Sequence, residues 1–266
     1  MSQTVDDPAL ASLTLWWRDM GIVADEAHIR AHGTARTVAS ETQAPPRKAP
    51  PARMSRKARQ RTPAEWSQVA GATAAACKTH GELVDAITAF DGCPLKEAAT
   101  KTVVFDGVQG APVMVIGEGP GRDEDLAGLP FVGRAGKLLD KMLASIDIDR
   151  TRNALITNVN YWRPPRNRNP EADELQVCAP FVHRMIALNR PKLIIAAGAV
   201  PAKALLGSSS GIMKLRGTQQ SLEVTGAGTI PLMPILHPAY LLRRPEEKAR
   251  AWRDLLTIEN LLQSLT

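Results

Sequence analysis

The sequence of 266 residues has little cysteine and no long apolar run, and each absence narrows the class of protein. Its three cysteines are an odd number without the spacing of a disulfide framework, which favours a reducing compartment. No stretch of about 18 apolar residues is present to span a membrane, and the N-terminus lacks the basic start and apolar core of a secretion signal. We therefore expect a cytoplasmic, monomeric protein with no membrane partner.

Acidic residues are missing from positions 42–64, where five prolines and seven basic residues gather. Such a composition cannot bury a core, so we expect a flexible Pro/Arg-rich linker over 36–63. Upstream, apolar residues at helical spacing predict a helix over 8–21. The chain is thus expected to consist of an N-terminal helical extension (1–35), the linker and a main domain (64–266).

Apolar runs alternate with helical segments in the main domain. The runs cover 113–117, 154–158, 192–197 and 230–236. This alternation is typical of a parallel sheet with helices on both faces. We expect an α/β fold with three α/β/α layers and a central four-stranded parallel sheet. Ligands bind such sheets at the carboxyl ends of the strands.

A glycine-rich loop follows the first of these runs and contains Gly117, Gly119 and Gly121. Closely spaced glycines let backbone amides approach a flat or anionic ligand. A dinucleotide-binding loop would need a glycine where Arg122 stands, and Pro120 removes an amide that such a loop uses. No Gly-Lys-Ser/Thr follows, which excludes a Walker phosphate loop. The loop is then either a ligand site or a tight turn.

Further segments follow the later runs in a distinctive order. They are Ile156-Thr157-Asn158-Val159, Arg163-Pro164-Pro165-Arg166-Asn167-Arg168, Leu193-Ile194-Ile195-Ala196-Ala197-Gly198 and Leu236-His237-Pro238-Ala239-Tyr240-Leu241-Leu242-Arg243. Together with the glycine loop, they resemble the uracil-DNA glycosylase superfamily, most closely its family 4, from about residue 93 onward. The resemblance implies a hydrolase that releases flipped-out uracil from single- or double-stranded DNA and so begins base excision repair.

The same resemblance implies catalytic roles for residues that follow the strands. His237 would donate an N–H to the uracil oxygen on which negative charge develops. Gly119 stands where the wider superfamily has an acid, so water would be positioned by Glu118 or, as a second choice, by Glu124. Glu124 and Asp125 could instead brace the loop.

Base and DNA contacts are implied in the same way. Phe131 would stack on the flipped base, unless it is an ordinary core residue. Asn158 would meet N3–H and O4 of uracil, a pattern that cytosine presents in reverse, and a backbone amide near Gly119 would hold another uracil oxygen. The DNA contacts would come from the phosphate-binding side chains of Arg134, Arg163, Arg168 and Arg243 and from a wedge formed by Leu241 or Leu242. Each of these could also be a surface charge or a core leucine.

Family 4 members typically hold a 4Fe–4S cluster with four cysteines, and only Cys93 and Cys178 match that pattern here. Phe90 and Trp162 stand at the other two positions, and neither side chain can bind iron. We therefore expect no cluster, no other cofactor and no metal. The two aromatic side chains would fill the cluster's volume and leave the cysteines as buried thiols.

Several alternatives stay open from the sequence. A glycosylase of this fold could accept hypoxanthine, xanthine or other deaminated bases, and a non-catalytic relative would bind damaged DNA without releasing a base. A nucleotide-binding enzyme unrelated to DNA is more remote. Cys77 and His80 are spaced like metal ligands on a predicted helix, so zinc or a rescued cluster is a further alternative.

Overall fold

The computed structural model of this protein describes residues 61–265. The expected extension over 1–35, its helix over 8–21 and nearly all of the expected linker lie outside the described residues.

The first described helix, α3 (Pro63–Ala76), begins one residue before the expected domain boundary. Pro63 suits the first position of a helix because its missing N–H would be unpaired there in any case. Thr62 caps the helix, since its hydroxyl accepts from the Glu65 N–H at 3.3 Å and the Glu65 carboxylate accepts from the Thr62 N–H at 2.6 Å. The proline at the first position and the capping contacts thus mark where the proline-rich segment gives way to a helix.

The centre of the fold is a six-stranded sheet in the order β1-β3-β2-β4-β6-β5. Its four inner strands run parallel to one another. They are β2 (Val113–Gly117), β3 (Ala154–Asn158), β4 (Leu193–Ala197) and β6 (Gly228–Ile235). The expected four-stranded parallel sheet is therefore confirmed as the middle of a larger, mixed sheet.

Two antiparallel strands that the sequence analysis did not predict close the edges of the sheet. β1 (Phe105–Gly107) pairs with β3, and β5 (Gln220–Val224) pairs with β6. β1 is only three residues long, and β5 buries only Leu222 and Val224. Neither strand presents the continuous apolar run that marks a strand buried on both faces.

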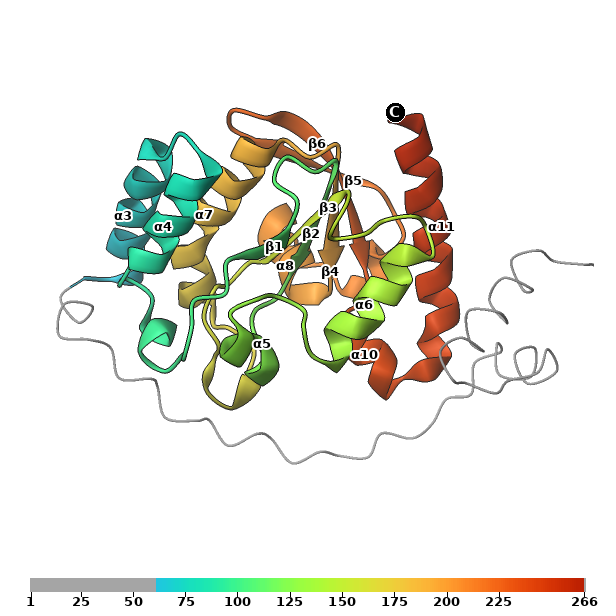
Figure 1. Ribbon diagram of the computed structural model, residues 1–266, viewed down its shortest axis with the longest axis horizontal. Coiled ribbons are helices and arrows are strands. Elements are labelled where there is room, and N and C mark those ends of the chain that lie inside the picture. The colour runs from blue at the N-terminus through green and yellow to red at the C-terminus, as the bar shows by residue number, and fades with distance from the viewer. Residues whose placement is uncertain (1–60, 266) are drawn as a thin grey trace, which may run out of the picture.

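Helices cover both faces of the sheet, which confirms the three layers (Figure 1). One face carries α3, α4 (His80–Ala89), α7 (Ala172–Asn189) and α8 (Ala199–Leu206). The opposite face carries α6 (Arg134–Ala144), α10 (Pro238–Arg243) and α11 (Lys248–Ser264). Successive side chains of a strand point to opposite faces, so Met114 packs with the first group of helices and Val115 with the second.

Short helices occupy the connections between these elements. They are η2 (Pro94–Glu97), α5 (Arg122–Ala127), η3 (Pro165–Asn167), α9 (Ile212–Leu215) and η4 (Pro245–Glu247). No helix among residues 61–265 combines the length and the apolar character that crossing a membrane requires.

Candidate active site

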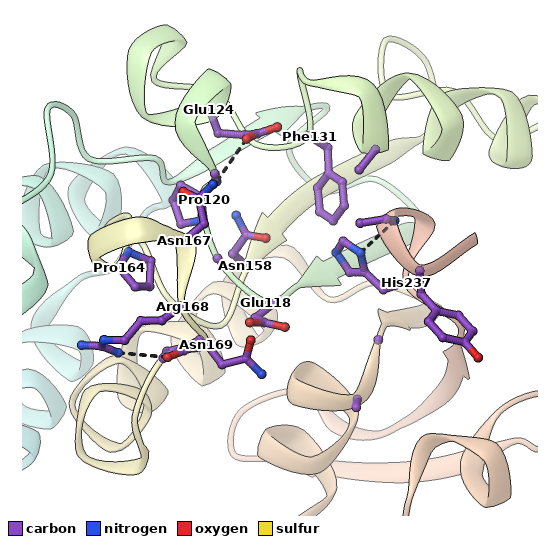
Figure 2. A pocket seen from close by; sticks show the side chains of 18 of the residues that line it. Glu118, Pro120, Glu124, Phe131, Asn158, Pro164, Asn167, Arg168, Asn169 and His237 are labelled. Atoms are coloured by element: carbon purple, nitrogen blue, oxygen red, sulfur yellow. Dashed lines mark hydrogen bonds between the residues drawn. The ribbon is translucent and has the colours of Figure 1, made fainter. Parts of the chain in front are cut away.

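A cleft of about 600 Å³ opens at the carboxyl ends of the four parallel strands (Figure 2). Among its lining residues are eight that the sequence singled out: Glu118, Gly119, Glu124, Phe131, Asn158, Arg168, His237 and Arg243. The cleft is also lined by residues that the sequence analysis did not single out, including Asn167, Asn169, Met213 and Tyr240. The structure thus brings the glycine loop, the end of β3 and the end of β6 to one site.

Asn158 and Phe131 meet above the backbone of Gly117, the last residue of β2. A Cβ atom at Gly117 would lie 2.5 Å from both the Asn158 Oδ1 and the Phe131 ring, so only glycine fits there. Asn158 is 2% exposed, and no group among the described residues hydrogen-bonds to its side-chain amide. The amide lines the cleft, so solvent or a ligand can supply the partners that the protein does not.

The Phe131 ring faces the His237 imidazole across the cleft. Their ring centroids lie 5.8 Å apart and their planes are tilted by 30°. Figure 2 shows both rings and the side chains of Asn158 and Glu118 around a common space. An aromatic ring with polar groups beside it suits a planar, polar ligand such as a nucleobase, which can stack on the ring and meet the polar groups at its edge.

The His237 ring is oriented by the start of α10. His237 is the N-cap residue of this helix, and its Nδ1 accepts a hydrogen bond from the Ala239 N–H at 3.1 Å. Burial, together with the positive charge of Arg243, lowers the pKa of His237 to about 4, against a smaller opposing effect of Glu124. The imidazole is therefore neutral near pH 7, and with Nδ1 as acceptor its proton is assigned to Nε2.

Glu118 follows β2 directly and lines the cleft beside these groups. Burial raises the pKa of its carboxyl above the ordinary value of 4.5. The carboxylate has no hydrogen-bond or ion-pair partner among the described residues. It is free to act on a substrate or on water.

Glu124 has a different environment. Its Oε1 accepts hydrogen bonds from the N–H groups of Val132 and Gly133 at 3.1 and 2.9 Å, and its Oε2 accepts one from Gly121 at 3.1 Å. These contacts favour the bracing role that the sequence left open for this residue over water positioning. Asp125 also braces the chain, because it accepts the Thr100 N–H at 2.7 Å.

The four arginines expected to contact phosphates divide into two pairs. Arg168 donates to both oxygens of Glu174, at 2.8 and 2.6 Å, and these contacts, above all, raise the pKa of Arg168. Arg163 donates to the Asn167 Oδ1 at 2.6 Å. Arg134 and Arg243 are exposed and have no ion-pair partner among the described residues. The second pair is thus the better placed to bind phosphates.

The two leucines offered as a wedge also differ. Leu241 is 0% exposed and packs in the core on the α6 and α11 side of the sheet. Leu242 is 37% exposed. The wedge role expected for either leucine therefore does not suit Leu241, because this side chain is already buried inside the protein.

The region expected to hold an iron–sulfur cluster in related proteins is packed with aromatic side chains. The Phe90 ring lies 5.7 Å from the Trp66 ring and 5.0 Å from the Phe181 ring, measured between centroids. Trp162 is 1% exposed, and its indole N–H donates to the Thr102 hydroxyl at 3.0 Å. Two of the four ligand positions are thus filled by core aromatics, and the residues present do not fit a four-cysteine cluster.

The cysteines are buried free thiols, as expected for Cys93 and Cys178. Cys77 donates its thiol hydrogen to the Thr73 carbonyl at 3.2 Å, and the His80 Nδ1 lies 2.9 Å from the Asn189 Nδ2. Within residues 61–265, no three His, Cys, Asp or Glu side chains gather in a way that could hold a metal ion.

The fold and the cleft together define the class: an α/β protein with a polar cleft, lined in part by aromatic rings, where its parallel strands end. Residues 105–256 match the family model described as the Uracil DNA glycosylase superfamily, and the chain belongs to this superfamily.

Its relatives include several type-4 uracil-DNA glycosylases. The chain is 35% identical to that of Pyrobaculum aerophilum over 178 residues, which cover 65% of this chain and 90% of the relative. It is 35% identical to that of Archaeoglobus fulgidus over 184 residues, 68% of this chain and 92% of the relative. The protein of Thermotoga maritima is 37% identical over 159 residues, 59% of this chain and 80% of the relative. The recognition made from the sequence motifs is confirmed.

Proposed function

We propose that this protein is a uracil-DNA glycosylase that hydrolyses the N-glycosidic bond of uracil flipped out of DNA and so begins base excision repair. The observation that carries the proposal is the meeting of Phe131, Asn158 and His237 around one cleft, although they lie on three separate segments of the chain. Membership of the superfamily and the type-4 relatives support the same activity.

In this reaction, negative charge accumulates on the departing base while the sugar gains oxocarbenium character. A neutral His237 with its proton on Nε2 can donate to a uracil oxygen as that charge grows. Its low pKa helps, because the ring needs no deprotonation near pH 7 to adopt this tautomer. Such a fixed donor stabilises the transition state more than the ground state.

Water must then reach the sugar on the side away from the leaving base. Glu118 is our candidate for holding it, because its carboxylate lines the cleft and has no competing partner among the described residues. Glu124, the second candidate, binds three backbone amides instead. The superfamily's acid is missing at Gly119, which leaves Glu118 as the available carboxylate in this loop.

Base selection falls to Asn158 in this proposal. Its amide can accept from N3–H and donate to O4 of uracil at once, whereas cytosine presents an acceptor and a donor in the reverse order. The surrounding protein leaves both ends of the amide without a partner among the described residues. Stacking on Phe131 adds affinity for any planar base, and a backbone amide near Gly119 supplies another contact.

Arg134 and Arg243 are our candidates for binding the DNA phosphates, because they are exposed at the start of α6 and the end of α10. Leu242, exposed beside Arg243, is the candidate wedge for the space that the flipped base leaves in the stack. Arg163 and Arg168 would act indirectly, by holding the segment that carries Asn167 and Asn169. Strand preference, monomeric state and location in the cytoplasm stay predictions from the sequence.

We also propose that the protein works without an iron–sulfur cluster. The support is the packing of Phe90 and Trp162 at two ligand positions, since a cubane cluster needs a ligand on each iron. Iron and sulfide analysis of protein purified without oxygen tests this. About four irons per chain would contradict it.

The activity is tested with a panel of oligonucleotides, each carrying one uracil, hypoxanthine, xanthine or normal base, in single- and double-stranded form. After incubation, alkali cleaves the strand wherever a base has been lost. We expect cleavage at uracil and much slower cleavage at the other bases. Faster release of hypoxanthine or xanthine would make the protein a glycosylase of another specificity, and lesion binding without any release would make it a damage-binding protein.

A further inference from the structure

Phe131 has a backbone conformation that a bulky residue rarely adopts. Its φ is 54°, in the left-handed region, and its side chain is 7% exposed. Such a conformation persists only where the surroundings impose it, and it is common at functional sites. The direction of the Phe131 ring, and hence one wall of the cleft, depends on whatever holds this backbone.

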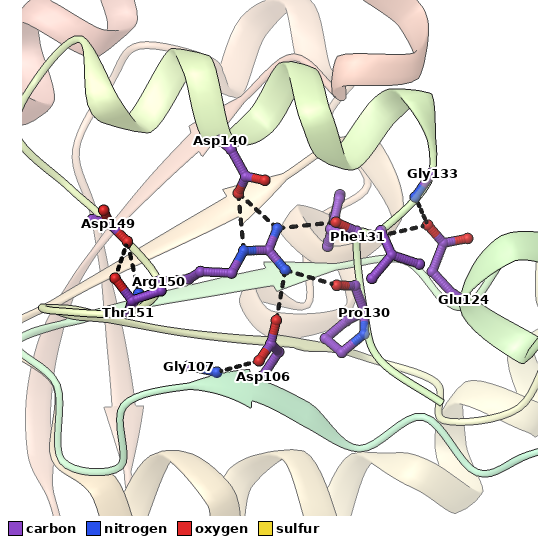
Figure 3. A network of polar contacts seen from close by, with 11 residues as sticks. Asp106, Gly107, Glu124, Pro130, Phe131, Gly133, Asp140, Asp149, Arg150 and Thr151 are labelled. Atoms are coloured by element: carbon purple, nitrogen blue, oxygen red, sulfur yellow. Dashed lines mark hydrogen bonds and ion pairs between the residues drawn. The ribbon is translucent and has the colours of Figure 1, made fainter. Parts of the chain in front are cut away.

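Arg150 holds the carbonyl side of this segment (Figure 3). Its Nη1 donates to the Pro130 carbonyl at 3.2 Å, and its Nη2 donates to the Phe131 carbonyl at 2.9 Å. The guanidinium is itself anchored, because it pairs with Asp106 on β1 at 2.8 Å and with Asp140 on α6 at 2.7 Å. Only 14% of the Arg150 side chain is exposed, so solvent screens these contacts little.

Glu124 holds the amide side of the same segment. Its Oε1 accepts from the N–H groups of the next two residues, Val132 and Gly133. The chain from Pro130 to Gly133 is thus held by the Arg150 guanidinium, which binds two carbonyls, and by the Glu124 carboxylate, which binds two amides. Two side chains thus fix the directions of three consecutive peptide groups, 130–131, 131–132 and 132–133, and the middle one is held at both its C=O and its N–H.

The space around Phe131 leaves little alternative for the backbone. A Cβ atom at Gly136, in the first turn of α6, would lie 1.9 Å from the Phe131 carbonyl oxygen. On the other side, the ring lies against Gly117. The carbonyl and the ring are both in close contact with the protein, so the direction of the ring is tied to the direction of this peptide group.

We propose that Arg150 is a positioning residue for base stacking: it acts through the Phe131 carbonyl to hold the ring where a flipped base would lie. Arg150 does not line the cleft, so it touches no part of the substrate. The inference rests on the proposed function for its substrate, but the fixed position of the ring is a property of the protein alone.

The first test measures single-turnover release of uracil by Arg150→Met, Arg150→Lys and Phe131→Ala and by the double variant Arg150→Met/Phe131→Ala. The matched control is Arg152→Met, because Arg152 is 59% exposed and pairs with Asp147 at 2.8 Å. We expect about tenfold to hundredfold loss for Arg150→Met. Lysine should restore part of the rate, because it keeps the charge but not the planar fork. The control should stay within about twofold of the wild type.

The double variant separates positioning from a general structural role. If Arg150 acts through the ring, its removal should change the rate less than about twofold once Phe131 is alanine. Losses that multiply in the double variant, or an unchanged rate in Arg150→Met, would overturn the proposal. Should Arg150→Met fail to fold, Arg150→Lys replaces it in both the single and the double variant, and the same comparison of rates is made.

A second measurement does not depend on activity. The chain has only four phenylalanines, so labelling with para-fluorophenylalanine gives a fluorine NMR spectrum in which Phe131→Leu identifies the Phe131 signal. We expect Arg150→Met to shift or broaden that signal and Arg152→Met to leave it in place. If the wild type releases no uracil, the proposed function fails, while this spectrum still decides whether Arg150 positions the ring.

Discussion

The cleft and the aromatic region around Phe90 and Trp162 differ in whether their buried polar side-chain groups have hydrogen-bond partners. In the cleft, Asn158 is 2% exposed as a residue, and its side-chain amide has no hydrogen-bond partner among the described residues. In the aromatic region, the one polar group of Trp162 is paired with Thr102, and the rings pack edge to face. The cleft thus keeps polar groups ready for a ligand, whereas the aromatic region contributes to stability.

The two regions are close neighbours in spite of this difference. Asn160, two residues after β3, donates to the Trp162 carbonyl at 2.6 Å. Its Nδ2 would also lie only 3.0 Å from a Cβ atom at Gly119 in the cleft loop. One side chain therefore borders both regions. If the comparison is correct, mutations in the aromatic region should change stability, and mutations in the cleft should change turnover.

The largest expected effect is on stability, from Phe90→Ala. Loss of a buried phenylalanine that contacts Trp66 and Phe181 should lower the free energy of unfolding by about 3–5 kcal/mol. Denaturant unfolding measures this, with Leu126→Ala as the control because Leu126 is 55% exposed. The rate of uracil release per folded molecule should stay near that of the wild type. A fall in that rate without a loss of stability would show that the aromatic region serves the chemistry.

His237→Ala tests the other side of the comparison. We expect kcat to fall about 10²–10³-fold, since a donor aimed at developing charge is lost, while the affinity for uracil-containing DNA changes little. Stability should fall by only about 1 kcal/mol, because the contact that the fold loses is the hydrogen bond by which Nδ1 caps α10. His183→Ala, on α7 outside the cleft lining, is the matched control. Equal losses of kcat and affinity would make His237 a binding group only.

The inner strands could be predicted from the sequence, because each is a short apolar run buried on both faces. The polar residues directly after them, Glu118, Asn158 and His237, could be placed for the same reason: the end of a parallel strand fixes where the next side chain lies. The edge strands could not, because β1 and β5 lack such a run.

Contacts between distant segments explain what the sequence could not supply. Arg150 is a charged residue like any surface arginine until the fold brings it to the carbonyl of Phe131, 19 residues earlier. Leu241 and Leu242 are adjacent on one helix, and only the docking of α10 decides that the first is buried and the second exposed. The loop acid Glu124 likewise acquires its role from the amides of Val132 and Gly133.

Asn158→Asp should have an intermediate effect, on selectivity. The substitution replaces the donor end of the amide with an acceptor and adds charge, so the contact with O4 of uracil becomes unfavourable. We expect the preference for uracil over cytosine to fall by about 1–3 kcal/mol, measured as the ratio of kcat/KM on the two oligonucleotides. Asn153→Asp is the control, because the Asn153 side chain lies outside the cleft lining. Its Oδ1 accepts a hydrogen bond from the Asp149 N–H in the loop before β3. Unchanged discrimination would remove Asn158 from base recognition.

The smallest expected effect is a shift in the pH dependence of the rate. This shift distinguishes the titration of Glu118 from that of His237. Glu118 must be ionised to hold water, and burial raises its pKa above 4.5, so the rate should rise with pH through that raised pKa. His237 is neutral above a pKa of about 4 and should add a further loss only below it.

Single-turnover rates across the acidic range should therefore show an acid limb above pH 4.5. Glu118→Gln should move that limb down towards about 4, where only His237 still titrates. A wild-type limb already centred near 4 and unmoved by the substitution would assign the limb to His237 and remove Glu118 from water positioning.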